Sequence, residues 1–107
     1  MSAKPIVPRA QARRDVDDAV DHYLREADAD IAIAFIDAFE EACRLISEHP
    51  GAGSPRYAHE LDLPGLRSKG LGGYPFLLFY IERANHIDLW RVLHARRDIS
   101  AWLSHEE

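Results

Sequence analysis

The sequence contains few of the features that mark a secreted protein or a membrane protein. Its 107 residues include one cysteine, Cys43, so no disulfide can form within the chain, and a lone thiol fits a reducing compartment. No apolar run approaches the ~20 residues that cross a bilayer. The first residues, MSAKPIVPRAQ, lack the apolar segment of a secretory signal. We therefore expect a cytoplasmic protein.

Basic charge is also scarce. The chain holds 13 Lys and Arg against 18 Asp and Glu, a net charge of −5. Residues 1–60 have seven basic and twelve acidic side chains, whereas residues 61–107 have six of each. Strong general binding to nucleic acid needs a basic excess that releases counterions. The composition excludes that class of protein and leaves room for a local basic surface.

Sequence motifs for metals, phosphates and catalysis are missing as well. No histidine pair has zinc spacing, and the aspartates between residues 15 and 21 do not have the spacing of a calcium loop. Gly70, Gly72 and Gly73 are not followed by the lysine of a phosphate-binding loop. The sequence predicts no catalytic residue, metal or cofactor, and favours a protein that acts through its surface.

Residue patterns predict a single domain, residues 1–107, with the order β-α-α-β-β-β-α. Apolar side chains at steps of three and four predict helices over residues 10–27 and from Asp28 or Asp30 to about His49. Strands are expected over residues 4–9, 66–71, 76–81 and 86–94. A short terminal helix capped by Asp98 should carry Ile99, Trp102 and Leu103 on one face. Residues 51–64 are expected to form a surface loop, and Asn85 to take a positive φ in a turn.

This order predicts an α+β fold, with a helical hairpin packed on one face of a small, mainly antiparallel sheet. One hairpin covers only one face of a sheet. Since residues 76–81 are apolar at every position, the other face needs different cover, of which the terminal helix supplies little. We therefore expect a partner protein to cover it. Ile33 and Ile36 lie off the apolar stripe of the second helix, either as scattered surface residues or as partner contacts.

The end of the last predicted strand carries a basic cluster. Arg96 and Arg97 follow His94 and precede the terminal helix, so they are candidates for contact with an acidic partner. The alternative is that they balance Asp88 and Asp98 and tie the helix to the sheet. Arg91 lies mid-strand, and we interpret it as structural. We expect Trp90 in the core, Trp102 at a contact, and His94 as a hydrogen-bonded structural histidine.

Six short motifs follow one another along nearly the whole chain. They comprise Ala12, Asp15, Ala19 and Tyr23; Ala32, Phe35 and Phe39; Leu45 or Ile46 with Pro50 and Gly53; GLR (65–67); YPFLLFY (74–80); and RVLHARRD (91–98). Their order and spacing resemble the ParE/RelE toxin superfamily of bacterial type II toxin–antitoxin modules. The resemblance implies one of two activities.

RelE-like toxins cut messenger RNA on the ribosome, using lysines and arginines, an arginine in the central strand and a tyrosine near the C-terminus. In this chain Leu77 stands near the arginine position, and Trp102, which has no hydroxyl, stands near the tyrosine position. Arg96 remains where an arginine is expected. The loss of two expected groups disfavours ribonuclease chemistry.

The ParE-like branch resembles the chain better, especially in YPFLLFY and LHARRD. This resemblance implies a toxin that is not itself an enzyme, that binds DNA gyrase and traps it with broken DNA, and that a ParD-like antitoxin neutralises. A family member that binds its antitoxin without being toxic is a further alternative. The expected target-binding residues are Arg67, Lys69, His94, Arg96, Arg97 and Trp102. The expected antitoxin-binding residues are Ile33, Ile36, Phe76, Leu78, Tyr80 and Trp90.

Overall fold

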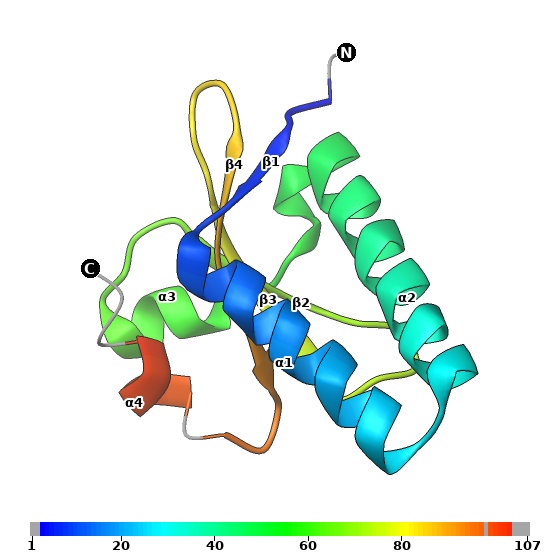
Figure 1. Cartoon of the computed structure of the whole chain (residues 1–107). Helices are drawn as coiled ribbons and strands as arrows, with labels where there is room; N and C mark the ends of the chain where they lie inside the picture. The colour runs from blue at the N-terminus through cyan, green and yellow to red at the C-terminus, as the bar shows by residue number, and fades with distance from the viewer. Residues whose placement is uncertain (1–2, 98, 104–107) are drawn as a thin grey trace.

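A mixed four-stranded sheet with the strand order β1-β4-β3-β2 forms the centre of the molecule (Figure 1). The structure, a computed structural model, describes residues 3–97 and 99–103. The strands are β1 (Ile6–Pro8), β2 (Leu66–Gly70), β3 (Phe76–Glu82) and β4 (Ile87–His94). β1 pairs with β4 in parallel and the other pairs are antiparallel. The α+β fold and the β-α-α-β-β-β-α order are confirmed, including the predicted edge strand near residues 4–9.

Two long helices form an antiparallel hairpin over one face of the sheet, which we call the hairpin face (Figure 1). They are α1 (Ala10–Glu26) and α2 (Ala29–Glu48). Asp28 caps α2, because its side-chain oxygen accepts a hydrogen bond from the Ile31 N–H at 2.9 Å. The chain leaves α2 at His49 and enters a single 3-10 turn, η1 (Pro50–Ala52). Both helices lie where apolar periodicity places them.

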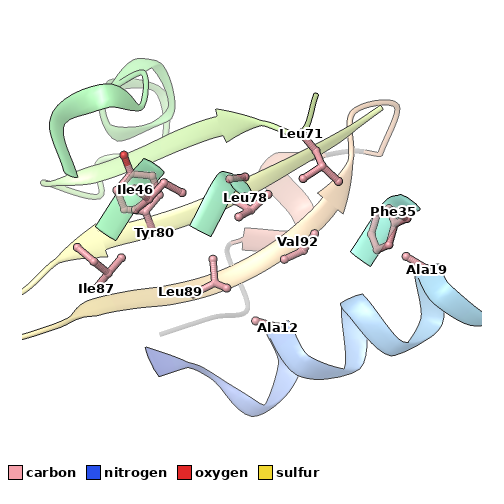
Figure 2. Packing of buried hydrophobic residues seen from close by; sticks show 11 residues of the cluster. Ala12, Ala19, Phe35, Ile46, Leu71, Leu78, Tyr80, Ile87, Leu89 and Val92 are labelled. Atoms are coloured by element: carbon pink, nitrogen blue, oxygen red, sulfur yellow. The ribbon is translucent and has the colours of Figure 1, made fainter. Parts of the chain in front are cut away.

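The core under the hairpin combines alanine and aromatic side chains with the aliphatic side chains of the strands (Figure 2). Ala12, Ala19 and Phe35 face Leu78, Leu89 and Val92 of the strands. At one end of the hairpin, the Phe35 ring lies 5.4 Å from the rings of Tyr23, Tyr74 and Phe76, measured between centroids. These contacts give a packing reason for three of the six motifs.

The motif that ends α2 is explained by Tyr80, whose ring is fully buried. Its hydroxyl donates a hydrogen bond to the Pro50 carbonyl at 2.7 Å and accepts one from the Gly53 N–H at 3.0 Å. A Cβ atom on Gly53 would lie 2.5 Å from the Tyr80 oxygen. Glycine is therefore required at residue 53 for space, since its φ of −76° is open to any residue.

The opposite face of the sheet, the reverse face, is covered by two short helices of the same chain. These are α3 (Arg56–Leu61) and α4 (Ile99–Leu103), which lie away from α2 in Figure 1. Ile99 and Leu103 of α4 pack with the buried side chains of the strands, and α3 adds Tyr57, Ala58 and Leu61. The buried strand residues of this cluster are Leu66, Phe79, Ile81, Trp90 and Leu93.

Four expectations about this part of the chain need correction. The apolar reverse face is not left for a partner, because α3 and α4 cover it. Residues 51–64 are not all loop, since α3 lies among them. Trp102 is exposed and does not share the buried side of α4 with Ile99 and Leu103. Among the described residues, positive φ occurs at Asp62, Gly65 and Gly73, so the expectation for Asn85 is wrong. Asp98 lies outside the described residues.

Candidate interaction surfaces

Four cationic or aromatic side chains come together where β4 ends and α4 begins. Arg96 and Arg97 are exposed on the turn after β4. The Arg97 guanidinium lies 4.3 Å from the centroid of the Trp102 ring, within cation–π range. His94 precedes them, and its Nδ1 accepts a hydrogen bond from the Arg96 N–H at 3.1 Å. We call His94, Arg96, Arg97 and Trp102 the basic tip.

His94 has the features of a structural histidine. Its ring packs edge-on against Phe76 with centroids 5.2 Å apart, and its Nδ1 is taken up by the Arg96 N–H. The neutral ring therefore carries its proton on Nε2. These two contacts hold the turn that presents Arg96 and Arg97.

A buried ion pair between Asp15 and Arg91 lies next to the basic tip. The Arg91 guanidinium donates to the two carboxylate oxygens of Asp15 at 2.7 and 2.8 Å, and the side chains are 4% and 9% exposed. The same carboxylate accepts the Val92 N–H at 3.0 Å, beyond the point where β1 stops pairing with β4. Arg91 also lies 5.1 Å from the centroid of the Trp102 ring. Asp15 thus joins α1, β4 and α4.

This contact confirms that Arg91 has a structural place, and it gives Arg91 a partner, Asp15, that the sequence did not predict. The sequence analysis had both residues in its motifs but did not connect them. They are 76 positions apart, and a pattern within one chain gives no pairing at that range. The available signal was the position of Asp15, on the face of the first helix that otherwise carries apolar residues.

A second ionic cluster surrounds Asp88 at the other end of β4. Arg9 and Arg83 both donate to its carboxylate, at distances of 2.9 to 3.2 Å, and the Trp90 indole N–H donates at 3.2 Å. Burial alone would raise the pKa of Asp88, but the hydrogen bonds from Arg9 and Arg83 outweigh it and lower the pKa below its ordinary value. Arg9 also stacks over the Trp90 ring at 4.2 Å.

Two of the expected target-binding residues belong to other surfaces. Arg67 donates to the Gly53 carbonyl at 2.7 Å and lines a hollow beside α3. Lys69 lines a separate hollow against α2, with Ala38 and Leu45. The structure therefore gathers His94, Arg96, Arg97 and Trp102, and places Arg67 and Lys69 elsewhere.

Most of the expected antitoxin-binding residues lie in the core. Leu78 and Tyr80 are fully buried under the hairpin, Phe76 is partly buried beside them, and Trp90 is buried on the reverse face. Leu78, Tyr80 and Phe76 do not form an open surface, because the helical hairpin covers them. The burial of Trp90 confirms its expected place in the core and does not fit a contact with a partner. Ile33 and Ile36 differ from them: they are 56% and 36% exposed on the outer side of α2.

The described residues contain no group of three or more His, Cys, Asp or Glu side chains placed to hold a metal. Burial, with a smaller effect of Glu40, raises the pKa of the Cys43 thiol to about 12, so the protonated form prevails at neutral pH. In the described part of the chain, no helix combines the length and the apolar character that a membrane span requires.

The structure matches a solved structure titled "Chromosomal ParDE TA system from P. aeruginosa", with a TM-score of 0.72 over 86% of this chain and 96% of that chain. At 21% sequence identity this likeness establishes the fold alone. Residues 6–99 match the family described as "ParE toxin of type II toxin-antitoxin system, parDE", and the chain therefore belongs to the ParE toxin family. No curated protein matches the sequence. Membership in a ParDE system implies a complex with an antitoxin.

Proposed function

We propose that this protein binds DNA gyrase through the basic tip, traps the enzyme with broken DNA, and is neutralised by a ParD-like antitoxin. The observation that carries the proposal is the pair of exposed side chains Arg96 and Arg97, of which Arg97 stacks on Trp102. Arginine pairs with carboxylates through two parallel hydrogen bonds, and exposed tryptophan and arginine dominate binding energies at protein interfaces.

Two of the positions that RelE-like toxins use for catalysis hold no acid, base or phosphate ligand in this chain. Leu77 packs against the apolar cluster of the reverse face, and Trp102 has neither a proton to give from a hydroxyl nor a basic atom. Cleavage of RNA needs groups that activate the 2′-hydroxyl and stabilise the phosphate. The chemistry of the tip therefore supports binding over hydrolysis.

The experiment mixes the purified chain with DNA gyrase and supercoiled plasmid and measures the accumulation of cleaved DNA. The wild-type chain should increase cleaved DNA, and the double variant Arg96→Glu/Arg97→Glu should abolish most of the increase while its melting temperature stays within a few degrees of wild type. The matched control is Arg25→Glu/Arg56→Glu, which makes the same charge change at exposed residues of α1 and α3 and should keep the activity.

Two results would contradict the proposal. One is a wild-type chain that leaves gyrase unaffected and cuts transcripts on ribosomes, which would favour the RelE-like activity. The other is a large loss of thermal stability in Arg96→Glu/Arg97→Glu, which would make these arginines structural. Co-expression with the product of the neighbouring small gene tests the antitoxin: a stable complex is expected.

A further inference from the structure

Two stacks of arginine on tryptophan adjoin each other on the reverse face of the sheet. In the first, the Arg9 guanidinium lies 4.2 Å from the centroid of the Trp90 ring. In the second, the guanidinium groups of Arg91 and Arg97 lie 5.1 and 4.3 Å from the centroid of the Trp102 ring. Trp90 and Arg91 are consecutive residues of β4, so the two stacks meet at the backbone. We call these five residues the arginine–tryptophan row.

A β-bulge in β4 brings the two stacks together. Leu89 lies opposite Tyr80 and Arg91 lies opposite Phe79, so Trp90 is an extra residue without a partner on β3. Residues directly opposite each other share one face of a sheet, and Phe79 belongs to the cluster of the reverse face together with Trp90. Two consecutive side chains, Trp90 and Arg91, therefore start from the same face, which a regular strand does not allow.

Exposed arginine side chains lie at both ends of the row. Near the start of β4, Arg9 and Arg83 share the one carboxylate of Asp88, and their side chains are 32% and 43% exposed. Past the end of β4, Arg96 and Arg97 are exposed. Four cations against one carboxylate leave a local excess of positive charge along this side of β4.

The row is long enough to meet several anionic groups at once. The Arg9 N–H donates to the Leu89 carbonyl at 2.9 Å, and the basic tip begins at His94, five residues further along β4. Five residues of a strand span roughly 17 Å. This length equals the axial rise of about five phosphates on one strand of duplex DNA.

The charges of the molecule are divided between the hairpin and the rest of the fold. Residues 10–48, which form the hairpin, contain eleven Asp and Glu against four Lys and Arg, a net charge of −7. The other described residues contain nine Lys and Arg against four Asp and Glu, a net charge of +5. Such a separation turns the hairpin away from an anionic partner and the row toward it.

We propose that the arginine–tryptophan row, together with Arg83 and Arg96, binds the phosphate backbone of duplex DNA. A guanidinium group pairs with a phosphate through two parallel hydrogen bonds. Trp90 is only 6% exposed and Trp102 carries Arg97, so the row offers cations and little open ring on which an unpaired base could stack. A duplex therefore fits better than a single strand.

A partner protein fits the row less well than DNA does. Interfaces between proteins have an apolar centre, whereas the exposed side chains of the row are arginines apart from Trp102. Because the row shares Arg97 and Trp102 with the basic tip, Arg9 and Arg83 supply the contacts that the tip does not. That the bound DNA is the segment held by gyrase rests on the proposed function.

The first test measures binding of the full chain to a fluorescently labelled duplex of about 20 base pairs by anisotropy, from about 50 to 200 mM salt. Three to four phosphate contacts predict that the logarithm of the binding constant falls with the logarithm of the salt concentration with a slope of about −3. Single-stranded DNA of the same sequence and a polyglutamate peptide should bind more weakly. Absence of duplex binding at about 50 mM salt, or tighter binding of the single strand or the peptide, overturns the proposal.

Variants at the two ends of the row sharpen the test. Arg83→Gln and Arg97→Gln each remove one cation from the row, and each should reduce the salt slope by about 1. The double variant should bind the duplex about tenfold or more weakly at low salt, with a melting temperature within a few degrees of wild type. Arg83→Lys keeps the charge and should retain most of the binding.

The matched control for the double variant is Arg13→Gln/Arg14→Gln, which removes two exposed cations from α1. It should weaken duplex binding less than about threefold and leave the salt slope unchanged. An equal loss in the control and in Arg83→Gln/Arg97→Gln would mean that net charge determines binding, and would overturn the proposal.

The gyrase assay separates this inference from the proposed function. If the wild-type chain increases cleaved DNA with gyrase but does not bind a free duplex, the proposed function stands and this inference fails. If the chain binds the duplex through the row but leaves gyrase unaffected, this inference stands and the proposed function fails.

Discussion

The two faces of the sheet are covered by very different helices. The hairpin face lies under helices of 17 and 20 residues, and the reverse face under helices of 6 and 5 residues. Both covers are complete at the centre: Leu78 and Tyr80 on one side of β3, and Phe79 on the other, have no exposed surface. Long helices are therefore not required to close a small sheet.

The difference lies in what holds each cover in place. A helix of five or six residues is too short to be stable alone, so α3 and α4 depend on their tertiary contacts. Phe79 packs against Tyr57 of α3 with centroids 5.4 Å apart, and Arg91, fixed by Asp15, lies under Trp102 of α4. We expect the reverse face to open at a lower free energy than the hairpin face.

The largest effect should come from emptying the core of each face in turn. Phe35→Ala removes a fully buried ring from the hairpin face and should cost about 3–5 kcal/mol of the free energy of unfolding. Leu103→Ala on α4 should cost about 2 kcal/mol, because a short terminal helix can relax into the space. Urea unfolding measures both. A Leu103→Ala variant that loses as much as Phe35→Ala would contradict the ranking of the two faces.

A loss between these two values is expected when the buried ion pair between Asp15 and Arg91 is broken. Asp15→Asn keeps an acceptor for the Val92 N–H but removes the negative charge that Asp15 places beside the buried Arg91 guanidinium, so we expect a loss of about 3 kcal/mol. The NMR signal of the Trp102 indole N–H should shift as well. Asp18→Asn is the control, because Asp18 is exposed and lies about one helical turn from Asp15. It should change the free energy of unfolding by less than about 0.5 kcal/mol. Equal stability of the two variants would show that the charge of Asp15 does not stabilise the fold.

The smallest effect depends on pH and involves Asp88. Its pKa is lower in the folded chain than its ordinary value of 3.8, so the ionised carboxylate stabilises the fold above that value, and the stabilisation is lost as the pH falls through 3.8 and below. Asp88→Asn should cost about 1 kcal/mol at neutral pH, since the Arg9 and Arg83 side chains are 32% and 43% exposed. The difference from wild type should shrink as the pH falls below 3.8, because the carboxylate is then protonated in both the folded and the unfolded chain. If the difference in the free energy of unfolding between wild type and Asp88→Asn stayed constant as the pH fell, the charge of Asp88 would play no part in stability.

Sequence patterns predict the hairpin face well and the reverse face poorly. Apolar periodicity over many turns gives α1 and α2, and the apolar run at residues 76–81 gives β3. The helix α3 is one and a half turns long and begins after Pro55, so no period is visible in it. Because the sequence did not reveal α3, the cover of the reverse face was underestimated. The expectation of an uncovered sheet was therefore wrong.

The candidate site shows the same division. His94, Arg96 and Arg97 are close in sequence and were predicted together, and the order of motifs led to the correct family. Contacts between distant residues were not predictable: these are the ion pair between Asp15 and Arg91 and the hydrogen bond from Arg67 to the Gly53 carbonyl. Each depends on how elements pack, which no local pattern records.

Hydrogen–deuterium exchange of the isolated chain tests most directly whether it covers both faces of its own sheet. The account predicts slow exchange for amides of β3 and β4 and measurable protection in α3 and α4, all in the absence of any partner. Exchange of α3 and α4 at the rate of an unfolded peptide, with protection gained only when an antitoxin is added, would contradict it and restore the uncovered face.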